Sequence, residues 1–235
     1  MYRGKRVTVY MPCRNEAKNL PRVLKSIPPF VDEVLVIDNN STDDTVKIAK
    51  KHGAKVLTEA RTKRGIGYGF AHMKGIKAAT GDIIVACDSD GQHPLKELSA
   101  MIDLLLDKNI DFISCSRYHK KHIAKIPLKL RVGVSALNLE VLLLYGVRIQ
   151  DILSGMWVFK KSARPKLHLS EGDWNLSPQI KISAATHEDV NFTEYPIEQK
   201  QRGGTSHQNY VSSGLRHAWW IAKSRVHKRK RTRKV

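Results

Sequence analysis

Two aspartates that lie one residue apart give the clearest chemical signal in this sequence. Asp88 and Asp90 follow a short apolar run over residues 83–87, which predicts a buried strand. Aspartates at the carboxyl end of a parallel strand lie where open α/β sheets bind their ligands. With Gln92 close behind, their oxygens suit Mg²⁺ or Mn²⁺ held jointly by protein and substrate phosphates. A solvated acidic turn is the alternative for a pair without further context.

The regions around these aspartates alternate between strands and helices. Strands that alternate with helices of ten or more residues predict an α/β fold with a mostly parallel sheet, flanked by helices on both faces. Asn15 is expected to cap the first helix. Strands are expected over 6–11, 33–37, 54–58, 82–87 and 111–115, and helices over 16–26, from 45 to about 53, from 69 to about 80, and over 94–106.

The last third of the chain has a different character. Residues 126–145 are apolar at helical spacing with interspersed charges, which fits either a core helix or a helix on a membrane surface. Glu194 begins a short edge strand that Pro196 limits. An amphipathic helix is expected over 209–226, followed by a run of basic residues over 228–234.

The composition predicts a folded domain with an unusual charge distribution. The chain has 235 residues, 41% hydrophobic and 27% charged, which are ordinary values for a folded protein. Its formal net charge is +19, and eleven Lys and Arg residues follow the last acidic residue, Glu198. Three cysteines, Cys13, Cys87 and Cys115, do not make a disulfide framework and fit buried residues in a reducing compartment.

Nothing in the sequence predicts passage through a membrane. We expect no secretory leader, because the residues after Met1 run directly into a strand. No apolar segment approaches the roughly 20 residues that a membrane span requires. A cytoplasmic protein that associates peripherally with the membrane is therefore expected.

Five segments in a fixed order resemble the inverting family 2 glycosyltransferases of the GT-A fold, and most of all the polyprenol-phosphate (dolichol-phosphate) mannose synthases. The resemblance implies a Rossmann-like sheet and transfer of a hexose from a nucleotide-diphosphate sugar to polyprenyl or dolichyl phosphate at the cytoplasmic membrane face. It favours mannose from GDP-mannose and requires Mg²⁺ or Mn²⁺. The segments are VYMPCRNE at 9–16 with NL at 19–20, VIDNNSTDDT at 36–45, RGIG at 64–67 with AATGD at 78–82, DSDGQHP at 88–94, and DILSGM at 151–156.

The same resemblance implies which residues bind the donor. A cation on Asp88, Asp90 and Gln92 would neutralise the charge that builds on the leaving diphosphate. Two positions depart from the family pattern: Asn39 or Asn40 replaces an Asp, and His207 replaces a Lys in the segment that begins at Arg202. The expected nucleotide-sugar contacts are Pro12, Arg14, Glu16, Asp38, Asn40, Asp88, Ser89, Asp90, Gln92 and Arg202.

A lipid phosphate acceptor has its own chemical requirements. It is already ionised at neutral pH and attacks without a general base, so cations are needed to hold it beside an anionic donor. The resemblance implies that Arg117, Arg131 and Ser135 hold this phosphate, and Arg131 and Ser135 have the i, i+4 spacing of one helix face. Asp88, Asp90, Arg117 and Arg131 are thus the expected catalytic residues. His93 is expected to make a loop hydrogen bond rather than act as a base.

Two other functions stay open at this point. A family 2 enzyme acting on a sugar hydroxyl needs a catalytic base, for which Asp151 is the candidate. A basic adaptor on membranes or nucleic acid would need no chemistry at all. The tryptophans at 219–220 and the eight Lys and Arg residues over 223–234 favour an anionic membrane surface. No specific nucleic-acid partner is expected, and a membrane-subunit partner stays open.

These features predict two parts. Residues 1–206 form the catalytic domain, including an interface helix over about 124–146. Residues 207–235 form the amphipathic helix and polybasic tail.

Overall fold

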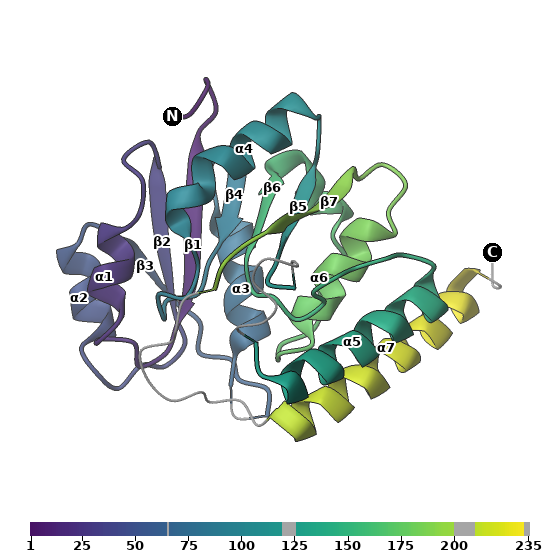
Figure 1. The fold of residues 1–235 in the computed structure, drawn as a ribbon. Coiled ribbons are helices and arrows are strands. Elements are labelled where there is room, and N and C mark those ends of the chain that lie inside the picture. Colours follow the sequence, from purple (N-terminus) through teal and green to yellow (C-terminus); the bar gives the residue numbers. More distant parts are fainter. Residues whose placement is uncertain (65, 119–125, 200–209, 233–235) are drawn as a thin grey trace.

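A seven-stranded sheet, parallel except for one strand, forms the centre of the described chain (Figure 1). The computed structural model describes residues 1–64, 66–118, 126–199 and 210–232. The strands are β1 (Val7–Cys13), β2 (Glu33–Asp38), β3 (Lys55–Thr58), β4 (Ile83–Ala86), β5 (Phe112–Ser116), β6 (Trp157–Lys160) and β7 (Phe192–Pro196). Their order is β3-β2-β1-β4-β6-β5-β7, and β6 is antiparallel to both of its neighbours. The expected mostly parallel sheet is confirmed.

Helices cover both faces of this sheet, as expected. The α-helices are α1 (Leu20–Lys25), α2 (Thr45–Lys51), α3 (Tyr68–Ala78), α4 (Leu98–Asp107), α5 (Leu128–Tyr145), α6 (Leu176–Ala185) and α7 (Tyr210–Thr232), with 3₁₀ helices at Leu95–Glu97 and Lys161–Lys166. Side chains alternate along β1, so Val9 and Met11 pack under α1 and α4, whereas Tyr10 packs under α3. The central strands β1, β4 and β5 are therefore buried on both faces, which is why most of their residues are apolar.

Two expected boundaries at the start of the chain are wrong. β1 continues through Pro12 to Cys13, because it pairs with β2 to its end but with β4 only as far as Tyr10. A proline is tolerated there because its missing N–H has no ladder partner on the β4 side. Asn15 does not cap a helix: it has φ +55° and its Oδ1 accepts a hydrogen bond from the Thr42 N–H at 2.8 Å. α1 begins only at Leu20.

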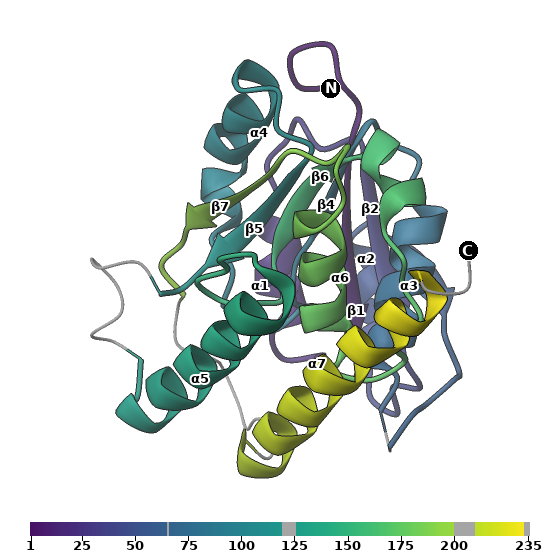
Figure 2. The ribbon, with the colours of Figure 1, turned by 90° about the vertical axis from the view of Figure 1, so that its right-hand side faces the viewer.

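α5 and α7 lie side by side outside the layers that cover the sheet (Figure 2). Val134, Leu137 and Val141 of α5 share a core with Trp220 and Ile221 of α7. One face of α5 is thus a core face, which was one of the two alternatives for 126–145. α7 begins close to its expected start but continues to Thr232, well into the basic segment. Among the described helices, none has the length and apolar character needed to cross a bilayer.

The same two helices also expose apolar side chains. Leu143 of α5 and Trp219 of α7 are 75% and 60% exposed, although such residues usually avoid water. We call the exposed set the α5–α7 apolar face. It consists of Leu128, Val132, Leu139, Leu142, Leu143, Leu215, Trp219 and Val226.

All three cysteines lie within the described core. Cys13, Cys87 and Cys115 are free thiols and at most 2% exposed, and burial raises the pKa of each. The expectation of small buried residues without disulfides is confirmed.

Buried histidines should make this fold sensitive to acid. Burial lowers the pKa of His72 to about 3 and the pKa values of His93 and His217 to about 4. The unfolded chain therefore binds more protons than the native chain between about pH 4 and 6.5, so stability is present above this window and is lost as the pH falls through it. Each histidine should contribute a slope of up to about 1.4 kcal/mol per pH unit.

Urea unfolding between pH 7 and 4.5 measures this slope. We expect His217→Gln to flatten the loss of free energy of unfolding by about 1 kcal/mol per pH unit, because one buried titrating group is removed. The matched control is His52→Gln, at an exposed helix end. Equal slopes in the two variants would contradict the prediction.

Candidate active site

Polar side chains from three parallel strands meet at one edge of the sheet. Cys13 at the end of β1 lies beside Asp38 at the end of β2, and Asp88 follows shortly after the end of β4. Ser89 donates from Oγ to the Pro12 carbonyl at 2.8 Å and thereby joins the β4 loop to β1. The structure thus brings together the donor-binding candidates Pro12, Asp38, Asp88 and Ser89.

The loop after β4 is tightly folded. Gly91 has φ +80°, a conformation that favours glycine, and the buried Asp90 accepts the Gln92 N–H at 3.0 Å. The Asp88 N–H donates to Nδ1 of His93 at 2.9 Å. His93 therefore makes the expected loop hydrogen bond and carries its proton on Nε2, which lies 3.6 Å from the Asp88 carboxylate. Since burial also lowers its pKa to about 4, His93 is neutral at pH 7.

The chemistry of this loop fits a shared divalent cation. Asp88 is partly exposed at 30% of its side chain, whereas Asp90 is buried beside it. Within the described residues, no group of three or more His, Cys, Asp or Glu side chains forms a complete metal cage. Mg²⁺ typically takes one or two carboxylates and completes its shell with water and substrate phosphate. Asp88, Asp90 and Gln92 have the donor atoms for such a site.

A cation that the sequence did not single out borders the same loop. Arg22 of α1 reaches the Asp90 carbonyl with Nη2 at 3.5 Å. A hollow beside it is lined by Arg22, Asp88, Gly91 and His93, among others. Arg22 is exposed, so its charge faces the hollow and the solvent rather than the core.

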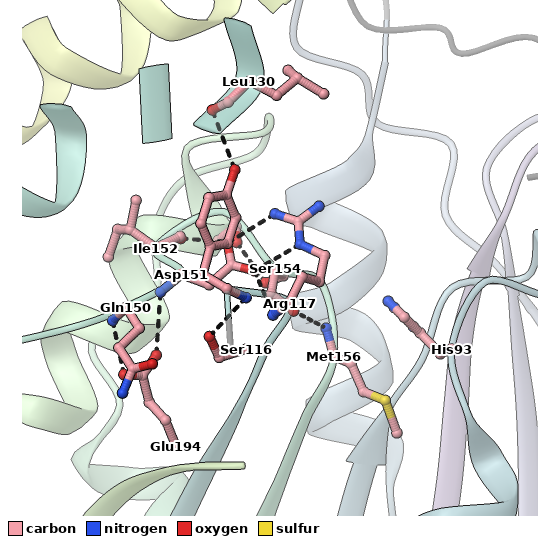
Figure 3. A network of polar contacts seen from close by, with 12 residues as sticks. His93, Ser116, Arg117, Leu130, Gln150, Asp151, Ile152, Ser154, Met156 and Glu194 are labelled. Carbon is pink, nitrogen blue, oxygen red and sulfur yellow. Dashed lines mark hydrogen bonds and ion pairs between the residues drawn. The ribbon is translucent and has the colours of Figure 1, made fainter. Parts of the chain in front are cut away.

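An ion pair between Arg117 and Asp151 forms the second half of the site (Figure 3). Arg117, just past β5, donates from Nε and its main-chain N–H to Oδ2 of Asp151 at 2.6 and 3.0 Å, and from Nη2 to Oδ1 at 2.8 Å. Burial alone would raise the pKa of Asp151, but the guanidinium outweighs it and lowers that pKa. Asp151 is fully buried, whereas the Arg117 side chain keeps 22% exposure.

The acceptor candidates on α5 lie close to this pair. Tyr118 donates from its hydroxyl to the Leu130 carbonyl at 3.2 Å, and its ring lies 5.9 Å from the Arg117 guanidinium. Arg131 is near enough to oppose the burial that raises the pKa of Tyr118 to about 12. Arg117 and Arg131 are therefore both within electrostatic reach of Tyr118. Ser135 follows on α5 and is exposed.

Residues 8–162 match the protein family described as glycosyl transferase family 2. This match covers more than half of the chain. The chain belongs to this family.

Individual relatives agree with this assignment. An uncharacterised glycosyltransferase of Mycobacterium tuberculosis is 37% identical over 151 residues, which are 63% of this chain and 65% of that protein, so the match spans less than two thirds of the relative. The UDP-N-acetylglucosamine–dolichyl-phosphate N-acetylglucosaminyltransferase of Methanococcus voltae is 27% identical over 216 residues, 83% of this chain and 85% of that protein. Both relatives thus agree with membership in the family, and neither name singles out the mannose synthases.

A solved structure confirms the expected GT-A-type fold. Glucosyl-3-phosphoglycerate synthase of Mycobacterium tuberculosis, crystallised with Mn²⁺, UDP-glucose and phosphoglyceric acid, superposes with a TM-score of 0.69. The alignment covers 94% of this chain and 80% of that chain at 24% sequence identity.

The remaining donor candidates have clear local roles. Glu16 is buried and accepts Nδ2 of Asn19 at 2.8 Å, and Arg14 is half-buried at the end of β1. Asn40 is exposed and donates to the Ala60 carbonyl at 3.0 Å. Asp38 accepts the Ser41 N–H at 3.2 Å. Arg202 and His207 lie outside the described residues.

Asn39 has a structural role that the sequence did not reveal. Its Oδ1 accepts the Gly67 N–H at 2.8 Å, and its Nδ2 donates to the carbonyls of Glu59 and Arg61 at 2.5 and 3.1 Å. A carboxylate has no N–H to donate to those carbonyls. An asparagine at this position therefore ties β2 to the loop that precedes α3.

Gly155 allows the two halves of the candidate site to approach each other. A Cβ at this position would lie 2.9 Å from the Tyr68 hydroxyl and 3.0 Å from Asp88 Oδ2. We expect Gly155→Ala to displace the Asp88 carboxylate and to lower kcat/KM roughly 100-fold, because small displacements of a catalytic group are costly. Steady-state transfer assays measure the effect. The control is Gly133→Ala on α5, where a Cβ meets nothing within 4 Å; equal activity in both variants would contradict the prediction.

Proposed function

We propose that this glycosyltransferase moves a hexose from a nucleotide-diphosphate sugar to polyprenyl or dolichyl phosphate in one inverting displacement that depends on Mg²⁺ or Mn²⁺. The observation that carries the proposal is the buried clamp between Arg117 and Asp151. It holds a fixed guanidinium, rather than a free carboxylate, on the side of the site to which we assign the acceptor. A fixed cation suits an acceptor that is itself an anion.

The donor side supports departure of a diphosphate. Asp88, Asp90 and Gln92 would hold the cation, which when bound supplies positive charge for the leaving phosphates. Around it, Pro12, Asp38 and Ser89 form the wall in which we place the nucleoside. A likeness to the synthase crystallised with Mn²⁺ and UDP-glucose is consistent with a cation site next to a nucleoside site.

The acceptor side favours phosphate over a hydroxyl. A hydroxyl acceptor needs a base whose pKa lies near neutrality, but every carboxylate oxygen of Asp151 already accepts from Arg117 and its pKa is lowered. Arg117 and Arg131 instead offer two cations around Tyr118. We therefore place the acceptor phosphate against Arg117 and Arg131, with Ser135 as a hydroxyl donor.

The identity of the sugar comes from resemblance alone. The sequence segments favour GDP-mannose, whereas the Methanococcus voltae relative is named for UDP-N-acetylglucosamine and the synthase was crystallised with UDP-glucose. The decisive assay therefore incubates the protein with Mn²⁺, a short polyprenyl phosphate and labelled GDP-mannose, UDP-glucose or UDP-N-acetylglucosamine. A labelled lipid with one of these donors supports the proposal. No labelled lipid with any of them, while nucleotide still binds, would refute the lipid-phosphate acceptor, and loss of metal-dependent nucleotide binding as well would favour a non-catalytic adaptor.

We also propose that the enzyme binds the cytoplasmic face of an anionic membrane through the α5–α7 apolar face. The exposed leucines of α5 and Trp219 of α7 lie on the two helices that are packed against each other. Lys223 lies 4.4 Å over the Trp219 ring, so a cation accompanies the exposed aromatic side chain. Apolar side chains beside cations are typical of helices that lie in the interface of a bilayer.

Vesicle sedimentation tests this surface. We expect Leu139→Glu with Leu143→Glu to weaken binding to vesicles containing phosphatidylserine roughly 10-fold or more, because two exposed apolar side chains that would enter the bilayer become charges that the anionic lipids repel. The control is Lys161→Glu, because the Lys161 side chain contacts the Thr80 carbonyl and does not belong to α5 or α7. Vesicles without polyprenyl phosphate keep this measurement independent of catalysis. Unchanged binding, or a dimer that dissociates in the double variant, would contradict membrane docking.

A further inference from the structure

Lys181 is a buried lysine beneath the loop that carries Asp151. It belongs to α6 and is fully buried. Its Nζ donates to the main-chain carbonyls of Asp151 and Ser154 at 2.8 and 2.6 Å, and to the Ser177 hydroxyl at 3.4 Å. An ammonium has three N–H donors, so these three oxygens use all of them. A buried charge is costly without such partners, so packing alone does not explain a lysine here.

The two carbonyls that Lys181 binds lie at the two ends of a short segment, 151–154. Ser177 reinforces the same contact from α6, because its hydroxyl donates to the Ser154 carbonyl at 2.9 Å. On the other side, Glu194 of β7 accepts the Asp151 N–H at 3.2 Å. The segment is therefore held from beneath by α6 and from the sheet edge by β7.

The opposite side of this segment faces the candidate active site. The Asp151 carboxylate orients Arg117, and Gly155 lies against the Asp88 carboxylate. Figure 3 shows Asp151 beside Arg117 on one side and beside Gln150 and Glu194 on the other. A shift of the segment would thus move the acceptor cation and the neighbour of Asp88 together.

We infer that Lys181 is a positioning residue for glycosyl transfer, which fixes the 151–155 loop so that Asp151 aims Arg117 at the acceptor phosphate. The inference rests on the phosphate role proposed for Arg117. Without the ammonium, the carbonyls of Asp151 and Ser154 lose buried donors and the loop relaxes. Misplacement of a catalytic group by about 1 Å is sufficient to lower a rate roughly 100-fold.

The charge environment of Lys181 adds a pH signature. Burial lowers its pKa to about 7, opposed by Asp151. Above that pH the amine has one donor fewer, so the loop loses a hydrogen bond as the pH rises. Arg117 and Asp151 face Lys181 from the loop side. The other titratable groups within its electrostatic reach are Glu194, Cys115, His93 and His217.

The test compares Lys181→Met and Lys181→Arg with the matched control Lys161→Met, which also removes an ammonium bound to a main-chain carbonyl, that of Thr80, away from the site. In Lys181→Met we expect kcat for transfer to a short polyprenyl phosphate to fall roughly 100-fold while the nucleotide Kd stays within about twofold. In Lys181→Arg, which stays charged, the loss of kcat above about pH 7 should disappear. Ser177→Ala is the milder variant and should also lower kcat. It replaces Lys181→Met as the test if Lys181→Met does not fold.

A readout without activity separates this inference from the proposed function. We expect hydrogen exchange of the amides at 151–156 to accelerate in Lys181→Met and Ser177→Ala, but not in Lys161→Met. If the wild type transfers no sugar to polyprenyl phosphate, the proposed function fails, and accelerated exchange still supports the structural part of the inference. Unchanged hydrogen exchange and unchanged kcat in both α6 variants would overturn the inference. A loss of kcat in the Lys161→Met control as large as that in Lys181→Met would also overturn it.

Discussion

Asp90→Asn is expected to lower kcat/KM by about 1,000-fold or more, because one negative charge at the cation site is removed. Asn keeps an oxygen that can accept the Gln92 N–H, so the β4 loop and the fold should be preserved. The same variant should lose the metal dependence of nucleotide binding. Steady-state assays over a range of Mn²⁺ concentrations, together with nucleotide binding with and without metal, measure both effects.

Asp189→Asn provides the control for Asp90. Asp189 is an exposed aspartate in the turn before β7, remote from the β4 loop. The Asp189→Asn variant should leave both the metal dependence of nucleotide binding and turnover unchanged. Full turnover of Asp90→Asn in metal-free buffer would refute the proposed cation site.

Arg117→Met is expected to destabilise the protein and to abolish transfer to the lipid phosphate. The buried Asp151 would lose its partner, which typically costs about 3–5 kcal/mol of the free energy of unfolding. Transfer should fall by about 1,000-fold or more, because the cation that we place against the acceptor phosphate is gone. Urea unfolding measures the first effect and the labelled-lipid assay the second.

A double variant separates these two effects. In Arg117→Met combined with Asp151→Asn, no unpaired buried carboxylate remains, so much of the stability should return. Transfer to polyprenyl phosphate should stay lost, since the guanidinium is still missing. Recovery of transfer in the double variant would show that Arg117 serves only to neutralise Asp151. Asp151→Asn alone should retain reduced transfer to phosphate, whereas a hydroxyl-dependent enzyme would lose all activity.

Local sequence patterns predicted the strands that are buried on both faces. β1, β2, β4 and β5 are mostly apolar runs with turn residues at their ends, so their existence followed from the local sequence pattern. β6 and α6 did not stand out. β6 has only four residues, and α6 contains Pro178 and buries the polar Ser177 and Lys181, which obscures its apolar periodicity.

Some residues of the candidate site were likewise predictable from the sequence, and others were not. Asp38, Asp88 and Asp90 were predictable because they follow strands whose ends meet at one edge. The pairing of Arg117 with Asp151 was not, because it joins residues far apart in sequence through the antiparallel return of the chain into β6. Helical spacing correctly placed Arg131 and Ser135 on one helix. The hydrogen-bond partners of Asn39 could not be predicted, because its place after a β-strand gives no sign of what the side chain binds.

Because its three native thiols are buried, the folded protein should give almost no background reaction with reagents that label cysteine. Because Cys13, Cys87 and Cys115 are nearly inaccessible and remain protonated, alkylating reagents should modify them only when the central strands open. A single cysteine introduced on the surface of α5 or α7 would then be the sole reactive site in the folded state. Fluorescent probes at such positions would report contact with a lipid phase without any need to remove the natural cysteines.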